Sequence, residues 1–219
     1  SVVSRCTANS NTSSGISAGL GSVLTDDAAS SNSGAGISVA GQGTIRNCTA
    51  VSNQTGFLTG PGSTIVSSGA HTNTQDGIVA SSNTIVRECT ATFNGGVGIR
   101  ADVNARVVDS VASSNTTDGI QVSSACTVMG NTSSSNGNGG VGAGIHVTAN
   151  NNRIDGNAVT SNDVGIRVDI GGNLLVRNSA RANGTNYLDN ASLGENSWGP
   201  VLTSATIETN PSAHANYVH

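Results

Sequence analysis

An asparagine recurs along the chain at a nearly constant interval, and this period limits the possible folds more than any other feature. Successive members lie 21, 21, 20, 21, 21, 21, 26 and 21 residues apart. The series comprises Asn11, Asn32, Asn53, Asn73, Asn94, Asn115, Asn136, Asn162 and Asn183. A fixed period of this length is typical of a solenoid, in which each repeat forms one coil that packs against its neighbours. We therefore predict about nine coils, each of roughly 21 residues.

Apolar residues at fixed offsets from this asparagine trace the path of each coil. An aliphatic residue lies eight positions before it in every coil, and a glycine followed by a large apolar residue comes shortly after it in most coils. Apolar positions two residues apart indicate short β-strands, and steps of three between such pairs indicate corners. Glycine and β-branched residues fill every coil, which excludes a helical path. The pattern predicts an all-β fold, a single-stranded right-handed parallel β-helix over residues 1–190.

Composition supports a thin, repeated core. Only 35% of the residues are hydrophobic and 2% are aromatic, too few to fill the interior of a broad two-layer domain. Most of the few aromatic side chains, including Tyr187, Trp198 and Tyr217, gather where the repeat decays. We expect residues 191–219 to form an irregular C-terminal cap that covers the exposed end of the solenoid. No such cap is evident before Val2, and we expect the parent protein to supply a preceding segment.

One repeat, the segment from Ile45 to Phe57 with the sequence Ile-Arg-Asn-Cys-Thr-Ala-Val-Ser-Asn-Gln-Thr-Gly-Phe, resembles the parallel β-helix repeat of pectin-lyase-like proteins. The similarity extends over residues 2–190, in particular to secreted bacterial β-helix repeat proteins of unassigned role. It implies a β-helix in a bacterial protein that is secreted or attached to the cell surface. It implies no particular activity, because the same scaffold serves lyases, hydrolases, epimerases, tailspikes and inert stalks.

Charge and cysteine content exclude several classes of partner. The formal net charge is −4 and all nine basic residues are arginines, so no lysine-rich stripe exists to bind nucleic acid. No apolar run reaches the ~20 residues that span a bilayer. No Cys-x-x-Cys motif or histidine cluster indicates a metal or a cofactor. Cys6, Cys48 and Cys89 lie two coils apart, roughly 9.6 Å at strand spacing, and Cys126 lies in another column, so we expect four free thiols.

The repeat predicts two outward faces on which function could reside. One is a flat plane of Thr, Ser and Ala, which fits an ordered lattice such as ice, a trimer seam or no partner at all. The other is small or apolar in the first coils and becomes polar and charged in the later ones. Its polar members are Arg100, Asp102, Gln121, His146, Arg167 and Asp169. The one insertion in the repeat, within Gly137–Gly144, directly precedes His146, and an extra loop beside polar residues is typical of a site.

These six residues form the candidate site. Arg100 and Arg167 lie three coils apart, on the order of 14 Å, which fits a few sugar units, and guanidinium groups can bind carboxylates bidentately. His146 lies between them and could act as a general base. We therefore expect an acidic polysaccharide as the ligand. The structural alternative is that Arg100–Asp102 and Arg167–Asp169 are exposed ion pairs within a strand, worth roughly 0–1 kcal/mol.

The sequence as a whole favours an extracellular scaffold or glycan-contact module without catalytic machinery, either monomeric or homotrimeric. Two alternatives stay open. One is a polysaccharide lyase or glycoside hydrolase of the pectin-lyase-like type that uses His146. The other is a solenoid whose flat face binds ice or another lattice.

Overall fold

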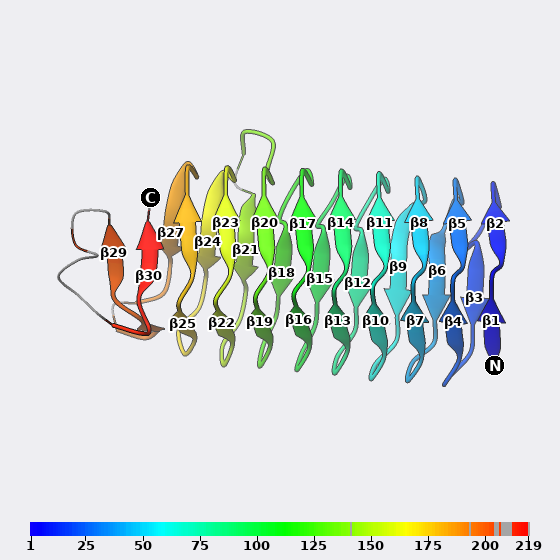
Figure 1. Cartoon of the computed structure of the whole chain (residues 1–219), viewed down its shortest axis with the longest axis horizontal. Coiled ribbons are helices and arrows are strands. Elements are labelled where there is room, and N and C mark those ends of the chain that lie inside the picture. The colour runs from blue at the N-terminus through cyan, green and yellow to red at the C-terminus, as the bar shows by residue number, and fades with distance from the viewer. Residues whose placement is uncertain (141, 193, 204–205, 207–211, 219) are drawn as a thin grey trace.

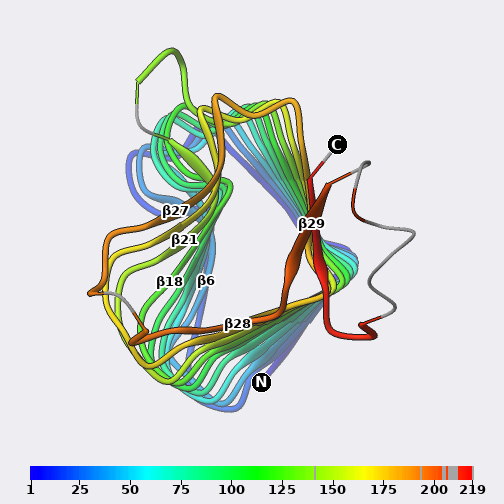
Figure 2. The same ribbon diagram turned by 90° about the vertical axis from the view of Figure 1, so that its left-hand side faces the viewer.

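The computed structural model is a parallel β-helix, which confirms the predicted fold. It describes the whole chain except residues 141, 193, 204–205, 207–211 and 219. Strands of two to five residues form three parallel sheets that wind around one axis, and coils stack along that axis (Figure 1). Viewed along the axis, the three sheets enclose a triangular core (Figure 2). The described residues contain no helix, and therefore none that could span a membrane.

Each of the nine coils contributes one strand to every sheet, and β28, β29 and β30 add further strands to the first and second sheets. The first sheet contains β1 (Val2–Ser4), β4 (Val23–Thr25), β7 (Thr44–Arg46), β10 (Thr64–Val66), β13 (Ile85–Arg87), β16 (Arg106–Val108), β19 (Thr127–Met129), β22 (Arg153–Asp155), β25 (Leu174–Val176) and β28 (Ser197–Trp198). The second contains β2 (Thr7–Asn9), β5 (Ala28–Ser30), β8 (Thr49–Val51), β11 (Gly69–His71), β14 (Thr90–Thr92), β17 (Val111–Ser113), β20 (Thr132–Ser134), β23 (Ala158–Thr160), β26 (Ser179–Arg181), β30 (Asn216–Val218) and β29 (Val201–Thr203). The third contains β3 (Ile16–Ala18), β6 (Ala35–Val39), β9 (Thr55–Thr59), β12 (Ile78–Ala80), β15 (Ile99–Ala101), β18 (Ile120–Val122), β21 (Ala143–Val147), β24 (Val164–Val168) and β27 (Thr185–Asp189).

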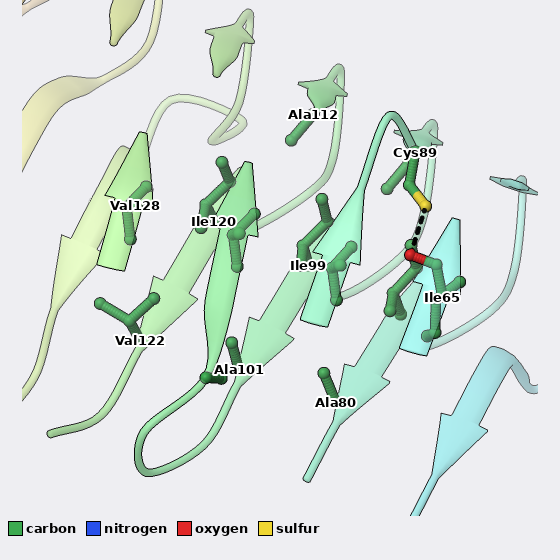
Figure 3. Close-up of a cluster of buried hydrophobic side chains, with 14 of the residues drawn as sticks. Ile65, Ala80, Cys89, Ile99, Ala101, Ala112, Ile120, Val122 and Val128 are labelled. Carbon is green, nitrogen blue, oxygen red and sulfur yellow. Dashed lines mark hydrogen bonds between the residues drawn. The ribbon is translucent and has the colours of Figure 1, made fainter. Parts of the chain in front are cut away.

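The core consists of identical positions stacked coil upon coil. The middle residue of each first-sheet strand points inward, and Ile65, Val86 and Val107 are fully buried in this column. The third sheet contributes a parallel column in which Ile99 lies directly beside Ile120 (Figure 3). Because the register is constant, each side chain packs on its equivalent at the ~4.8 Å strand spacing.

The predicted asparagine ladder is confirmed at the corner between the second and third sheets. The side-chain oxygen of Asn94 accepts hydrogen bonds from the backbone N–H and the side-chain amide of Asn73, at 3.1 and 2.9 Å. Its own amide nitrogen donates to Asn115 Oδ1 and to the carbonyl of Ala70, at 2.9 and 3.2 Å. The same bonds recur from coil to coil along the ladder. Every polar atom of these buried amides therefore has a partner.

Two further ladders occupy the other corners. Between the first and second sheets, Cys, Asp and Ser in the early coils give way to a run of amides. That run comprises Asn131, Asn157, Asn178 and Asn216. Between the third and first sheets, the backbone N–H of Cys126 donates to Asn152, and the ladder continues to Asn173 and Asn196. The residues of the ladder between the first and second sheets are buried, except that Cys6 is exposed in the first coil.

In the first ladder, each asparagine from Asn11 to Asn183 directly follows a residue whose backbone lies in the left-handed region. Ser52, Thr72 and Phe93, for example, have φ values of 56°, 53° and 57° and directly precede their ladder asparagines. A non-glycine residue in this region costs on the order of 1 kcal/mol. The buried amide bonds on the next residue offset that cost, because they hold the sharp corner in place.

A close approach explains the glycine that precedes the large apolar residue of most coils. A Cβ built on Gly98 would lie 2.5 Å from Asn115 Nδ2 and 2.6 Å from the carbonyl oxygen of Gly119. Gly77 meets Asn94 and Gly98 in the same way. A side chain at this position would therefore displace the ladder amide of the next coil.

Described residues beyond 190 extend two of the sheets. β28 pairs with β25 in the first sheet, and β30 pairs with β26 and β29 in the second. Tyr187 takes the place of the core isoleucine in β27, and its one hydroxyl proton is shared between the carbonyls of Asn178 and Tyr217, at 2.9 and 3.0 Å. Trp198 packs against it edge-to-face, with ring centroids 5.6 Å apart. The boundary between residues 190 and 191 stays a prediction, and part of the expected cap, at 193, 204–205, 207–211 and 219, lies outside the described residues.

The ladder predicts a position-dependent loss of stability. We expect Asn94→Ala to lower the free energy of unfolding by about 1–3 kcal/mol, because it leaves buried partners in two neighbouring coils unpaired. Asn11→Ala should cost less in this chain, because Asn11 is exposed and its ladder bonds in the structure run only to Asn32. Urea unfolding of both variants measures the difference. Equal losses at the two positions would contradict a ladder that is continuous through the middle coils.

Thiol accessibility gives a second prediction. All four cysteines are free, and Cys48, Cys89 and Cys126 are buried. Burial also raises the pKa of the Cys89 thiol to about 11, so little thiolate forms near neutral pH. We expect an alkylating reagent to modify Cys6 alone in the folded protein and all four thiols after denaturation without reductant. A chain two hydrogens lighter than expected by intact-mass spectrometry would show a disulfide and contradict the coil register.

Candidate functional site

The outward face of the third sheet carries most of the expected site residues in one line. Parallel pairing of β12, β15, β18, β21 and β24 places their central residues directly beside one another. In chain order these residues are Val79, Arg100, Gln121, His146 and Arg167. We call the last four the polar row. Strand alternation explains their direction, because both neighbours of each one in its strand point into the core.

His146 lies between two carboxylates. Its Nδ1 atom is 2.8 Å from Asp118 Oδ2, and its Nε2 atom is 2.8 Å from Asp169 Oδ2. The side chains of His146 and Asp118 are only 12% and 9% exposed, and that of Asp169 is 27% exposed. Both ring nitrogens can donate at once only when the imidazole is protonated. The arrangement therefore favours an imidazolium held as a clamp between adjacent coils.

The electrostatics of this clamp follow from its contacts. Burial alone would lower the pKa of His146, but the hydrogen bonds with Asp118 and Asp169 and their negative charges outweigh it and raise the pKa above its ordinary value. Burial would raise the pKa of Asp169, yet hydrogen bonds from His146, Arg167 and Asn190 lower it to about 2. Arg167 Nε and Asn190 Nδ2 both donate to Asp169 Oδ1, at 2.8 and 2.9 Å. Asp169 is thus a carboxylate with both oxygens engaged.

Arg100 is held by groups that the sequence analysis did not select. Its Nε and Nη2 atoms donate to Asp76, at 2.8 and 3.4 Å, and its Nη1 atom donates to Gln121 Oε1 at 2.6 Å. The prediction of an Arg100–Asp102 ion pair is wrong, because Arg100 pairs with Asp76 instead. Asp76 lies in the turn of the preceding coil and presents both oxygens to the guanidinium, while Asp102 accepts hydrogen bonds from the hydroxyls of Ser82 and Ser123. The expected Arg167–Asp169 pair does form.

Asp76 and Asp118 make equivalent hydrogen bonds in different coils. Each directly precedes a turn glycine, and its Oδ1 atom accepts the backbone N–H of the next coil, from Val97 at 2.8 Å and from Ala143 at 2.7 Å. Its Oδ2 atom bonds the polar-row side chain of that next coil, Arg100 for Asp76 and His146 for Asp118. In the sequence, the Asp-Gly pairs at residues 76–77 and 118–119 could have identified these two aspartates. The search for site residues followed the alternation within strands, and these pairs lie in turns outside the strands.

The insertion forms a loop beside the row. Figure 1 shows it between β20 and β21, and in Figure 2 it projects from the corner next to the third sheet. Asp163 Oδ2 accepts the N–H groups of Gly140 and Gly142, at 2.9 and 3.3 Å. Val141, part of the insertion noted in the sequence, lies outside the described residues. The loop is thus attached to the next coil through a carboxylate.

Two hollows flank the polar row. The first has a volume of about 240 Å³, lies at the carboxyl ends of β12, β15 and β18, and is lined by both apolar and polar residues. Its lining includes Val79, Ser81, Arg100, Asp102, Gln121, Val122 and Ser123. The second, of about 480 Å³, lies beneath the insertion. Its lining is Thr116, Thr117, Asp118, Asn138, Gly140, Gly142, His146 and Arg167. All six expected site residues thus lie on one surface. Five of them line a hollow, whereas Asp169 lines neither hollow and instead bonds His146 and Arg167.

The face that the sequence analysis expects to be flat lies on the outward side of the second sheet. His71 stands out on it, since its Nδ1 atom is 2.7 Å from Thr92 Oγ1 and burial lowers its pKa. Whether this face binds a lattice stays a prediction. Within the described residues, no three His, Cys, Asp or Glu side chains gather closely enough to hold a metal ion.

The clamp predicts how the stability of the fold depends on pH. The folded-state pKa of His146 is raised, so the clamp stabilises the fold fully below the ordinary value of ~6.5 and weakens as pH rises through the folded-state pKa. Asp169 contributes above ~3.9 and loses its contribution as pH falls toward its folded-state pKa of about 2. The clamp is therefore strongest between about pH 4 and pH 6.5.

NMR titration of the imidazole signals measures this directly. We expect a midpoint above ~6.5 for His146 and below it for His71. The stabilisation of the native chain over His146→Gln, measured by urea unfolding, should also shrink as pH rises above neutrality. A midpoint for His146 below that of His71 would rule out the clamp.

Comparison with known proteins agrees with this architecture. Among solved structures, the A-module of the mannuronan C-5 epimerase AlgE6 of Azotobacter vinelandii is similar with a TM-score of 0.60, at 16% identity over 90% of this chain and 63% of that one. The A-module of AlgE4 from the same organism has a TM-score of 0.50, at 14% identity over 87% of this chain and 86% of that one. The pectate lyase Pel9A has a TM-score of 0.50, at 19% identity over 94% of this chain and 51% of that one.

These similarities show the fold alone, because the identities are low. The chain spans less than two thirds of the AlgE6 module and about half of the pectate lyase. No curated protein sequence matches it. The family model for the right-handed beta helix region matches residues 36–183, most of the repeat. Together with the three stacked parallel sheets, this match shows that the chain belongs to the right-handed β-helix family.

Proposed function

We propose that this chain is a polysaccharide-contact module whose binding surface is the outward face of the third sheet. One observation carries the proposal. From Asp76 to Asn190, side chains of successive coils are joined by an unbroken series of hydrogen bonds, with a hollow on each side. A long, polar and rigid line of this kind fits a linear polymer better than a compact ligand.

Preorganisation supports binding on this face. The row lies on strands whose register is fixed by the sheet, and the engaged side chains lose little further freedom when a ligand arrives. Arg100 and Arg167 are three strand spacings apart, roughly 14 Å, so a bound chain would meet several polar groups at once. The solved structures of similar fold include a mannuronan epimerase and a pectate lyase, whose names indicate polysaccharide substrates. This supports a polysaccharide as the class of ligand.

The same contacts argue against catalysis by the expected residues. A general base needs a free nitrogen, yet both ring nitrogens of His146 face carboxylates and its raised pKa favours the protonated form. Hydrolysis by a pair of carboxylates needs both to face the scissile bond. Here Asp118 and Asp169 are turned toward the imidazole between them.

A lyase or hydrolase is the second candidate, and one observation favours it. His146, Asp118 and Arg167 line the hollow beneath the insertion, where an imidazolium could serve as a general acid. Turnover of the polysaccharides that bind, followed by ultraviolet absorbance for elimination and by reducing ends for hydrolysis, tests it. Activity that disappears in His146→Gln while binding persists would place this candidate first.

A polysaccharide ligand also fits a protein that is secreted or attached to the cell surface. We retain this localisation as part of the proposal.

Blocking the first hollow tests the binding surface. Ser81 and Ser123 line it, and the double variant Ser81→Leu/Ser123→Leu fills it without adding charge. We expect this variant to lose at least about tenfold in affinity for the polysaccharides that the native chain retains on a glycan array. The control is Ser113→Leu/Ser134→Leu, which makes the same change on the second sheet.

The control variant should bind as the native chain does. Loss of binding in the control alone would move the function to the flat face. Absence of binding to any polysaccharide would contradict the proposed function.

A further inference from the structure

We infer that the third-sheet face selects an uncharged, hydroxyl-rich glycan over an acidic one. The inference rests on the proposed function and concerns the ligand class of the same surface. It reverses the expectation drawn from the sequence, where Arg100 and Arg167 were taken as free cations for carboxylates. The structure shows what those cations already bind.

The charge balance of the face is negative. Between Asp76 and Asp169 the face carries two guanidinium groups, Arg100 and Arg167, and one imidazole, His146. Five carboxylates share this stretch, namely Asp76, Asp102, Asp118, Asp163 and Asp169. The net charge is therefore −2 with the imidazole protonated and −3 with it neutral. A polyanion approaching the face meets a field of its own sign.

Hydrogen bonding leaves little room for a ligand carboxylate. Each nitrogen of the Arg100 guanidinium already donates, to Asp76 or to Gln121. Bidentate capture of a ligand carboxylate by the Nε and Nη2 edge would require the displacement of Asp76, whose Oδ1 atom also accepts the backbone N–H of Val97. Arg167 uses its Nε atom on Asp169. Arg167 also lines the second hollow, but the carboxylate-bearing Asp118 lines the same hollow.

The groups that face the hollows instead suit hydroxyls. The exposed carboxylate of Asp102 accepts hydrogen bonds, among the described residues, only from the hydroxyls of Ser82 and Ser123, so its oxygens can accept further hydrogen bonds. Arg167 lines the second hollow, and within the described residues only its Nε atom has a hydrogen-bond partner, so its terminal nitrogens can donate to a ligand. A sugar hydroxyl both donates and accepts. An uncharged glycan can therefore use both kinds of group without desolvating an unpaired charge.

Two matched pairs of oligosaccharides separate charge from shape. The probes are hexagalacturonate and its methyl ester, and cellohexaose and its C6-carboxylated form, measured by calorimetry at about 20 mM and about 500 mM salt. We expect the uncharged member of a binding pair to bind roughly tenfold tighter at low salt. The difference should narrow at high salt, because repulsion between exposed charges is screened.

A charge-neutralising variant assigns the effect to this face. Asp102→Asn removes one negative charge beside the first hollow and should narrow the preference for the uncharged member several-fold. Asp109→Asn makes the same change at the opposite corner, just after β16, and should leave the preference as in the native chain.

The outcomes separate the two proposals. Tighter binding of the acidic member, weakened by salt, would overturn the charge inference and leave the polysaccharide-contact function standing. An equal effect of the two aspartate variants would also overturn it. Binding of none of the four probes, together with an empty glycan array, would instead count against the proposed function itself.

Discussion

The structure depends on the hydrogen bonds that join each coil to the next at the three corners. A chain with few large apolar side chains cannot rely on a thick core, and its coils must turn sharply through left-handed residues to close each triangle. The buried amides after those residues satisfy the corner backbone and one another. Because each amide bonds to the coils before and after it, the ladder also fixes the register. That register places Arg100, Gln121, His146 and Arg167 in one line.

The same rigidity shapes the candidate site. Asp76 and Asp118 each bind a backbone N–H of the following coil with one oxygen and a row side chain with the other. Charged groups are therefore built into the packing between coils rather than left pointing to solvent. Arg100 is 45% exposed on its side chain, yet all its nitrogens donate within the protein. Such a surface offers direction and shape to a ligand but little free charge, and this favours recognition of hydroxyls over recognition of carboxylates.

Much of the fold could be read from the sequence because it repeats in residue type. The Asn11–Asn183 ladder keeps one residue at one offset, so its period was visible. The ladder through Cys126 and Asn152 was missed because its corner changes residue type along the chain, which leaves no repeated letter. Strand alternation identified the polar row correctly as a set of neighbours. It could not rank carboxylates by distance, so Asp102 was paired with Arg100 although Asp76, one coil away, lies closer in space.

The central claim is that a polysaccharide contacts the polar row and not the flat face. Titration of a binding oligosaccharide into the isotopically labelled chain tests it most directly, because each face carries its own reporter. The account predicts chemical-shift changes at the His146 imidazole and the Gln121 side-chain amide, with the His71 imidazole unchanged. Changes at His71 that leave His146 and Gln121 unaffected would contradict it.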